Sequence, residues 1–431
     1  MTLGKMRRPV RGTVRRLLAL LVLWGMAAAL LPPAAMAAEG ELTAPVTIST
    51  GVPGTGSVQV EVRWDDGWFV NEASTYRHEL TAASMALSGA AYLGGRNTGI
   101  QAALKSLGFD GIQSYHYNPA PETAAEVAAY TFAVKEIPVP AGGSAWLTAI
   151  VVRGTGEYME WAGNFNMGGG SDHEGFAQAR DELLARLERY LSDRGLSGEK
   201  RKTMKFLVTG HSRGGAVANL TAAHLTEAAR ETGGSVYAYT FAAPTVSFHA
   251  AVEGYQNIFN IISGDDLVTQ VPLPAWGCGR YGLDLHLPTR AGYDGDYDAA
   301  FEKMNRRYIA LTGRPYAVYQ DGAAVEKMTS AIYRLVPNAS GASMAMLSAL
   351  FTGNFSGLSD LVRENSLAAI LLGRRALTLS NELTPLIQQE AGGMASAHCM
   401  ASYYSWLTAW ETVEEAEQMF SADLYPGAKT Q

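Results

Sequence analysis

The sequence predicts an α/β fold in which helices cover a mostly parallel sheet. Short apolar runs, typical of strands buried on both faces, recur along the chain at 146–152, 206–209, 236–241 and 257–262. Segments with apolar residues at helical spacing lie between these runs, at 173–193 and 217–225. This alternation is the pattern of parallel strands joined by crossover helices.

Residues 1–37 have the pattern of a secretory signal peptide. Six Lys and Arg residues and no acid lie within residues 1–16, and an apolar run of 15 residues follows from Leu17 to Leu31. That run is shorter than the ~20 residues needed to span a bilayer. Small residues then surround Ala37, so we expect cleavage there and secretion of the protein; an uncleaved anchor is the alternative.

Composition narrows the class of protein and its partners. With 47% hydrophobic residues the chain is that of a folded globular protein. Once the six cations of the leader are removed, 28 basic residues remain against 41 acidic ones, a net charge of −13. Such a surface repels phosphate backbones and anionic membranes, so nucleic acid is not expected as a partner.

The chain after the leader is predicted to have two parts. Residues 38–140 form an N-terminal region packed on the core, with strands and turns over 41–70 and two helices within 74–107. Residues 141–431 form the core itself, because the alternation of buried strands and helices begins there.

A candidate nucleophile lies in the segment Gly210-His211-Ser212-Arg213-Gly214. The pattern G-x-S-x-G is weak evidence alone, but here it stands between a buried strand and an Ala-rich helix. A serine in such a strained turn needs glycine on both sides, and the following helix directs its free N–H groups toward developing negative charge. The context therefore predicts a nucleophile elbow at Ser212; the alternative is a glycine-rich turn with an idle serine.

A serine nucleophile requires a base and an orienting acid, which in this architecture follow it along the chain. The strand 257–262 ends in two acids, and we favour Asp266 over Asp265 because the chain turns there toward Leu267. For the base we favour His398, in what reads as a flexible loop of small residues. The alternate base is His286, on the polar side of a predicted strand.

Residues 291–392 interrupt the alternation between the acid and histidine loops. Helix-like patterns near 323–335, 341–352 and 358–379 predict a helical insertion on the sheet. A cap over the active site and a plain elaboration of the packing are both open interpretations.

Several further segments within 146–272 and around His398 form a recognisable set: Arg153-Gly154-Thr155, Trp161 with Asn164-Phe165, His173-Glu174-Gly175-Phe176, Thr240-Phe241-Ala242-Ala243-Pro244, and Asp266-Leu267-Val268 with Pro272. In this order they resemble the class 3 (fungal-type) lipases of the α/β-hydrolase superfamily, in a secreted bacterial form. The resemblance implies an α/β-hydrolase fold and an oxyanion hole made by Thr155 and the backbone N–H of Arg213. It also implies that the loop 156–170 corresponds to the family's lid.

The function implied is lipase or esterase activity through an acyl-enzyme on Ser212, without metal or cofactor. The partner is then a lipid or other ester, with transient contact to a lipid interface. The same triad could serve an acyltransferase or a peptidase, and a non-catalytic binding protein is a third alternative. The Arg213 side chain has two interpretations, contact with an anionic substrate group or a structural ion pair.

The two cysteines lie near the predicted acid and base. Cys278 follows Asp266 by twelve residues, and Cys399 is adjacent to His398. A single cysteine pair in an exported protein suggests a disulfide, here between the acid loop and the histidine loop. We therefore expect a Cys278–Cys399 bond; two separate buried thiols are the alternative.

Overall fold

The computed structural model describes residues 41–93, 98–118, 127–140, 142–155, 172–336, 366–410 and 412–424. The chain forms two units, Met1–Glu41 and Leu42–Gln431, and the fold described here is that of the second. The predicted leader, the predicted lid 156–170 and the helix-like segment 341–352 lie outside the described residues.

A seven-stranded sheet with the order β3-β4-β5-β6-β7-β8-β9 forms the centre of the fold. Its strands are β3 (Asp110–Tyr115), β4 (Tyr130–Pro138), β5 (Ser144–Val152), β6 (Lys205–His211), β7 (Ser235–Phe241), β8 (Ile258–Ser263) and β9 (Leu283–Leu287). The pairs from β5 to β9 are parallel, whereas β3, β4 and β5 pair in antiparallel fashion. The predicted mostly parallel sheet is therefore confirmed.

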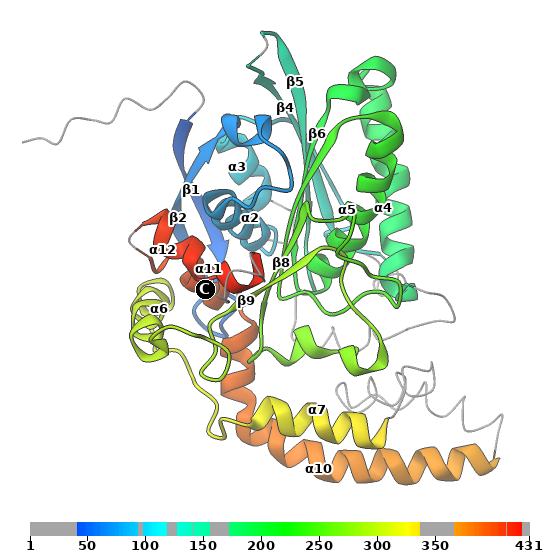
Figure 1. The fold of residues 1–431 in the computed structure, drawn as a ribbon, viewed down its shortest axis with the longest axis vertical. Coiled ribbons are helices and arrows are strands. Elements are labelled where there is room, and N and C mark those ends of the chain that lie inside the picture. The colour runs from blue at the N-terminus through cyan, green and yellow to red at the C-terminus, as the bar shows by residue number, and fades with distance from the viewer. Residues whose placement is uncertain are drawn as a thin grey trace, which may run out of the picture. The chain divides into compact units, whose positions relative to one another are not determined.

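Helices cover both faces of this sheet (Figure 1). On one face lie α4 (Glu174–Asp193) and α5 (Arg213–Thr232); on the other lie α2 (His78–Ala90) and α3 (Thr98–Ser106). Successive residues of one strand enter different cores, since Leu207 belongs to the cluster under α2 and Val208 to the cluster under α4 and α5. Because both faces are buried, the strands read as unbroken apolar runs in the sequence.

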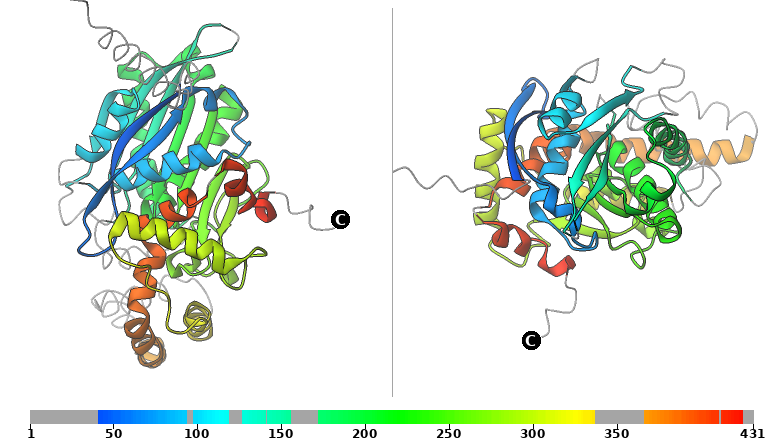
Figure 2. Two further views of the ribbon diagram at one scale, coloured as in Figure 1. Left: turned by 90° about the vertical axis from the view of Figure 1, so that its left-hand side faces the viewer. Right: turned by 90° about the horizontal axis from the view of Figure 1, so that it is seen from above.

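The N-terminal region contributes to two layers of the fold. β1 (Glu41–Ser49) and β2 (Ser57–Asp65) form a separate two-stranded sheet, and β2 packs against α2. A short 3-10 helix, η1 (Asp66–Val70), follows β2. β3 and β4 instead extend the central sheet, so part of residues 38–140 is continuous with the core. Figure 2 shows the two-stranded sheet outside α2, on the side away from α4 and α5.

The helical insertion lies between β9 and the C-terminal helices. It comprises α6 (Tyr297–Thr312), α7 (Ala324–Leu335) and α10 (Ser366–His398), of which α7 and α10 run side by side at the bottom of Figure 1. The chain then forms α11 (Met400–Thr408), α12 (Val413–Gln418) and α13 (Ser421–Leu424). α11 packs on both α6 and α2, which joins the insertion to the N-terminal region.

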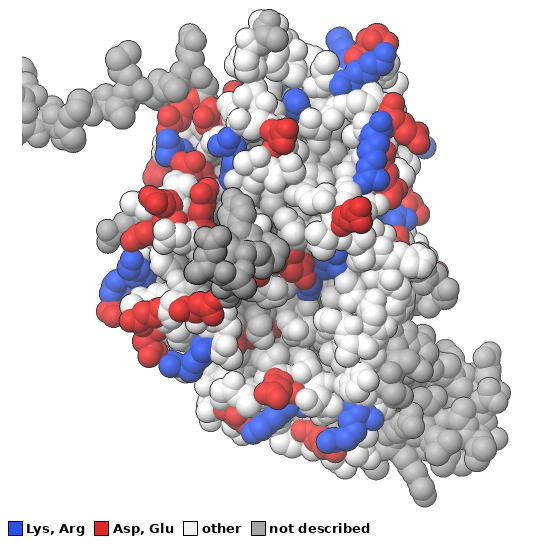
Figure 3. Space-filling view, viewed as in Figure 1, with Lys and Arg blue, Asp and Glu red and all other residues white. Residues whose placement is uncertain are grey.

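Acidic and basic side chains are intermingled on the face of the molecule shown in Figure 3. Several form exposed ion pairs, such as Arg290 with Asp298 at 2.6 Å and Arg306 with Glu302 at 2.6 Å. Exposed pairs of this kind contribute about 0–1 kcal/mol each, so burial of the two cores dominates stability. Within the described ranges, we find no helix with the length and apolar character needed to cross a membrane.

Candidate active site

Ser212 lies in a sharp turn between β6 and α5. Its backbone has φ 59° and ψ −131°, a conformation that residues with a side chain rarely adopt. The turn is possible because the residues two positions before and after Ser212 are glycines: a Cβ on Gly210 would collide with the backbone of Gly214, and a Cβ on Gly214 with the carbonyl of Val152. Strain held in this way by the surrounding packing is typical of functional sites.

The structure brings Ser212, His398 and Asp266 together. The Ser212 Oγ lies 2.9 Å from His398 Nε2, and His398 Nδ1 lies 2.8 Å from Asp266 Oδ2. All three residues are buried, with exposed fractions of 5%, 8% and 1% respectively. Both distances are those of hydrogen bonds, so a proton can pass from the hydroxyl to the imidazole while the carboxylate holds the opposite ring nitrogen.

The alternative acid and base make other contacts. The carbonyl oxygen of Asp265 accepts a hydrogen bond from the Tyr319 hydroxyl at 2.6 Å, and burial raises the pKa of its carboxyl group. His286 lies on β9, where Nδ1 is 3.1 Å from Asp423 Oδ1. That hydrogen bond raises the pKa of His286, and the side chain is largely exposed. In the described structure, neither Asp265 nor His286 is hydrogen-bonded to the side chains of Ser212, His398 or Asp266.

The carboxylate of Asp266 is fixed by two donors besides the imidazole. Asp266 follows β8 and caps the 3-10 helix η4 (Leu267–Gln270), where its Oδ1 accepts the N–H of Val268 at 3.0 Å. The Tyr403 hydroxyl donates to Oδ2 at 2.9 Å, and burial keeps that hydroxyl protonated by raising its pKa. The oxygen that faces His398 is therefore held in one orientation. Tyr403 was not predicted from the sequence, because nothing in its local pattern separates it from other buried aromatic residues.

Arg280 connects the acid loop with two neighbouring segments of the chain. Its guanidinium, almost fully buried, donates through Nε to the carbonyl of Ala243 at 2.9 Å and through Nη2 to the carbonyl of Thr269 in η4. Nη1 lies 2.7 Å from a carboxylate oxygen of Asp284 on β9. One planar cation thus ties the loop after β7, the acid loop and the edge strand together. This contact was also missed, since it joins three segments that are separate in sequence.

The expectation that His398 lies in a flexible loop is wrong. His398 is the last residue of α10, and α11 begins two residues later at Met400. Its segment is rich in Gly, Ser and Ala, which read as a loop, but the small side chains allow close packing. Gly393, for example, lies against Tyr319, where a Cβ would approach the tyrosine to 3.0 Å. Packing with its neighbours thus overrides the weak helix propensity of this segment.

Thr155 and Arg213, the residues predicted to form the oxyanion hole, lie after the end of β5 and at the start of α5. Thr155 follows β5, and its Oγ1 is buried without a hydrogen-bond partner in the described part of the chain. Arg213 is the first residue of α5, directly after Ser212, so its backbone N–H lies at the positive end of the helix dipole. The Arg213 side chain instead donates from Nη1 to the carbonyl of Val127 at 2.9 Å.

The expected Cys278–Cys399 disulfide is absent, because both cysteines are free and buried. The two thiols belong to different clusters: Cys278 lies with residues of the acid loop and α7, and Cys399 with residues of α6 and α11. The Cys399 Sγ lies 3.3 Å from the carbonyl of Ser396 and 3.7 Å from the Tyr308 hydroxyl. Proximity in sequence to the acid and the base therefore does not bring the two sulfur atoms together.

His173, in the segment His173-Glu174-Gly175-Phe176, is packed as a buried residue of the core. Its ring stacks on Phe176 with a centroid distance of 3.9 Å, and neither ring nitrogen has a hydrogen-bond partner in the described structure. Burial lowers the pKa of His173 to about 3, so the ring is neutral at ordinary pH. Among the described residues, no group of three His, Cys, Asp or Glu residues could hold a metal ion.

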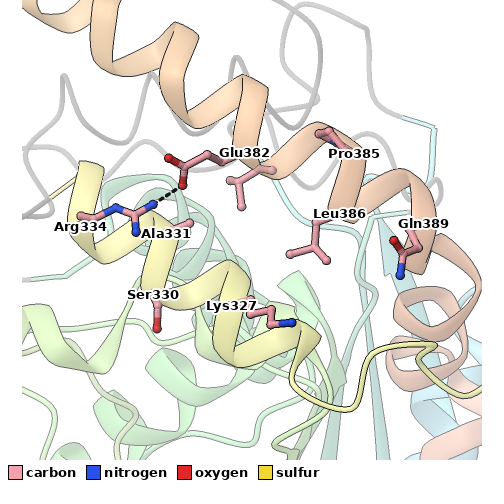
Figure 4. A pocket seen from close by; sticks show the side chains of 9 residues that line it. Lys327, Ser330, Ala331, Arg334, Glu382, Pro385, Leu386 and Gln389 are labelled. Atoms are coloured by element: carbon pink, nitrogen blue, oxygen red, sulfur yellow. Dashed lines mark hydrogen bonds and ion pairs between the residues drawn. The ribbon is translucent and has the colours of Figure 1, made fainter.

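A separate cavity of about 500 Å³ lies between α7 and α10. Figure 4 shows Lys327, Ser330 and Arg334 of α7 on one side and Glu382, Pro385 and Gln389 of α10 on the other. Arg334 and Glu382 form an ion pair across it. None of the three triad residues lines this cavity, so it is not part of the candidate active site.

Comparison with known proteins identifies the segment that carries the elbow and the acid loop. Residues 143–276 match the family model of class 3 lipases. A secreted mono- and diacylglycerol lipase from Fusarium solani is 34% identical over 140 residues. The match covers 30% of this chain and 40% of that relative, so the chain spans less than half of the relative's length.

Solved lipase structures are more distant. The native Rhizomucor miehei lipase–propeptide complex has 17% identity and a TM-score of 0.34, with 58% of this chain and 84% of that chain covered. The mono- and diacylglycerol lipase from Aspergillus oryzae has 18% identity and a TM-score of 0.34, with coverages of 50% and 81%. The strand order and the elbow described above are those of an α/β-hydrolase. Residues 143–276 therefore resemble the class 3 lipase family, and they lie within a fold of the α/β-hydrolase type.

Proposed function

We propose that this protein is a secreted carboxylic-ester hydrolase of the lipase type, acting through an acyl-enzyme on Ser212. The observation that carries the proposal is the chain of two hydrogen bonds, 2.9 Å and 2.8 Å long, from Ser212 through His398 to Asp266. The family match supports an ester of a lipid as the substrate. Mono- and diacylglycerols are the first candidates, because the Fusarium solani relative is named for them.

In the proposed mechanism, Ser212 Oγ attacks the ester carbonyl carbon while His398 Nε2 takes the hydroxyl proton. Asp266 holds the Nδ1–H and stabilises the imidazolium that forms. The oxyanion accepts hydrogen bonds from Thr155 Oγ1 and the Arg213 N–H. His398 then protonates the leaving alcohol, and a water activated by the same imidazole hydrolyses the acyl-enzyme. The unpartnered, buried hydroxyl of Thr155 supports its role, since such a group costs stability unless a ligand uses it.

Secretion follows from the pattern of residues 1–37, which we propose are removed after Ala37. The relative from Fusarium solani is itself described as secreted, which supports an extracellular location. Mass measurement of the protein recovered from culture medium would test both the cleavage site and the export.

The test of the activity is hydrolysis of p-nitrophenyl esters of increasing chain length. We expect Ser212→Ala to lower kcat by about 10⁶-fold, because the nucleophile is removed. The matched control is Ser192→Ala, at an exposed position near the end of α4. A fluorophosphonate should label the wild type and Ser192→Ala but not Ser212→Ala.

Two outcomes would contradict the proposal. If Ser212→Ala retained ester cleavage, a different group would be the nucleophile. If the folded wild type neither cleaved the esters nor reacted with the fluorophosphonate, a binding protein would be the better interpretation. Faster transfer of the acyl group to an added alcohol than to water would instead identify an acyltransferase, and cleavage of amides in preference to esters a peptidase.

A further inference from the structure

The imidazole of His211, the residue before the candidate nucleophile, bridges two distant parts of the chain. Its Nε2 lies 2.9 Å from the backbone carbonyl oxygen of His398, and its Nδ1 lies 3.1 Å from the Tyr92 hydroxyl. His211 is 2% exposed, so water does not compete for either contact. Three segments, the end of α2, the elbow and the end of α10, therefore meet at one ring.

The contact with His398 satisfies a group that the fold would otherwise leave without a partner. The last carbonyl oxygens of a helix have no N–H four residues further along the same helix. His398 is the last residue of α10, and it is buried. Because a carbonyl only accepts, Nε2 of His211 must carry the hydrogen. The elbow residue thus holds the backbone of the candidate base directly.

The Tyr92 hydroxyl completes the hydrogen bonding of this ring. Because Nε2 carries the hydrogen of the neutral ring, Nδ1 accepts, and the Tyr92 hydroxyl 3.1 Å away is its donor; the same hydroxyl lies 3.4 Å from the backbone carbonyl oxygen of His211. The same hydroxyl packs against Gly154, where a Cβ would collide with it. Tyr92 therefore also contacts the segment that carries Thr155.

A neutral His211 ring is compatible with a positive charge that forms on His398. Burial lowers the pKa of His211 well below its ordinary value, and the nearby His398 lowers it further. The rings of His211 and His398 are 5.0 Å apart, centroid to centroid. The other titratable groups facing His211 are Tyr92 and Tyr403, and burial raises the pKa of both. An imidazolium formed on His398 therefore meets no second cation here.

We propose that His211 and Tyr92 are positioning residues, which hold the backbone of His398 so that its Nε2 stays within hydrogen-bond distance of Ser212 Oγ. This rests on the proposed function, because positioning matters only if His398 is the base. Nothing in the proposal requires either residue to touch the substrate.

The test compares His211→Leu with His211→Gln in hydrolysis of a p-nitrophenyl ester. Leu removes the donor, and a misplacement of about 1 Å at a reacting group can cost ~10²-fold, so we expect kcat to fall about 10- to 100-fold with KM unchanged. Gln keeps an N–H donor and an oxygen acceptor, so we expect it to recover kcat to within about 3-fold of the wild type. The control is His224→Leu, at an exposed position on α5.

A second variant keeps the test valid if His211→Leu folds poorly. Tyr92→Phe removes the donor to Nδ1 and keeps the aromatic ring, and we expect a smaller fall in kcat, about 3- to 10-fold. Because the Tyr92 hydroxyl acts on His398 through the His211 ring, the two losses should be less than additive, and the kcat of Tyr92→Phe/His211→Leu should be close to that of His211→Leu alone. The fraction of active enzyme in each sample is measured by fluorophosphonate titration before the kcat values are compared.

Three results would overturn the proposal: full kcat in His211→Leu, an equal loss in His211→Gln, or additive losses in the double variant. These results differ from failure of the proposed function. If Ser212→Ala abolishes activity while His211→Leu retains it, only the positioning role is wrong. If Ser212→Ala has no effect on activity, both the mechanism and the positioning role are wrong.

Discussion

Two regions supply the candidate triad, and they hold their residues by different means. Ser212 and Asp266 follow strands β6 and β8 of the central sheet, where the ends of parallel strands meet at one edge. His398 instead ends the long helix α10, which packs with α7 outside the sheet. The hydrogen-bonded register of the sheet places the first two residues, whereas side-chain packing and the contact with His211 place the third.

This difference shows which residue depends on distant packing. A cluster containing Met328 of α7, Leu379 and Leu383 of α10, and Leu267 of the acid loop connects the helical pair with the residues next to Asp266. A loss of packing in that cluster can move the histidine and leave the elbow in place. A loss of packing under the sheet lowers global stability instead.

The largest effect is expected from a change of Asp266, the acid that follows strand β8. Asp266→Asn should lower kcat about 10⁴-fold with little change in KM, because an amide at this place favours the wrong imidazole tautomer and cannot stabilise the imidazolium. The matched control is Asp265→Asn, whose carboxyl lies beside the acid but outside the hydrogen-bonded chain. Steady-state hydrolysis of a p-nitrophenyl ester by both variants would check this. A greater loss in Asp265→Asn than in Asp266→Asn would reverse the assignment.

An intermediate effect is expected at the end of β5. Thr155→Val keeps the shape of the side chain and removes its hydroxyl, so kcat should fall about 10²- to 10³-fold if that hydroxyl stabilises the oxyanion. Thr155→Ser retains the hydroxyl and should stay within about tenfold of the wild type. Equal activity of the Val and Ser variants would remove Thr155 from the proposed oxyanion hole.

The smallest effect on catalysis is expected from the helical pair, and it distinguishes the two regions. Met328→Ala leaves a cavity in the cluster beside α10 and should lower the free energy of unfolding by about 2–5 kcal/mol. We expect it also to lower kcat several-fold, because the position of His398 loosens. Leu187→Ala, in the core between α4 and the sheet, should cost a similar free energy without lowering kcat of the folded enzyme. Denaturant unfolding together with kcat per titrated active site measures both quantities.

If Met328→Ala and Leu187→Ala changed kcat alike, the comparison of the two regions would be wrong. The volume-conserving variant Met328→Leu serves as the control for the cavity, since such exchanges usually cost less than about 1.5 kcal/mol.

Much of the architecture follows from the sequence because its signals are local. The strands of the central sheet are buried on both faces, so each is visible in the sequence as an apolar run. Helix α4 is buried on one face, so it is visible from leucines at helical spacing. The helical insertion was also predicted, although its helix α10 extends to His398 and so includes a segment that reads as a loop. The proposed disulfide failed because spacing along the chain says nothing about where two thiols point.

What the sequence determined by itself is the elbow: between a strand and a helix, glycines at 210 and 214 permit the tight turn at Ser212, because a Cβ at either position would collide with the neighbouring backbone. The tertiary structure decided which histidine reaches Ser212, since His286 and His398 both follow the acid and only packing separates them. It also decided the partners of the triad, Tyr403, His211 and Tyr92, none of which carries a local signal. The physical reason is range: backbone strain acts within a few residues, whereas a hydrogen bond between residues 187 positions apart depends on the whole fold.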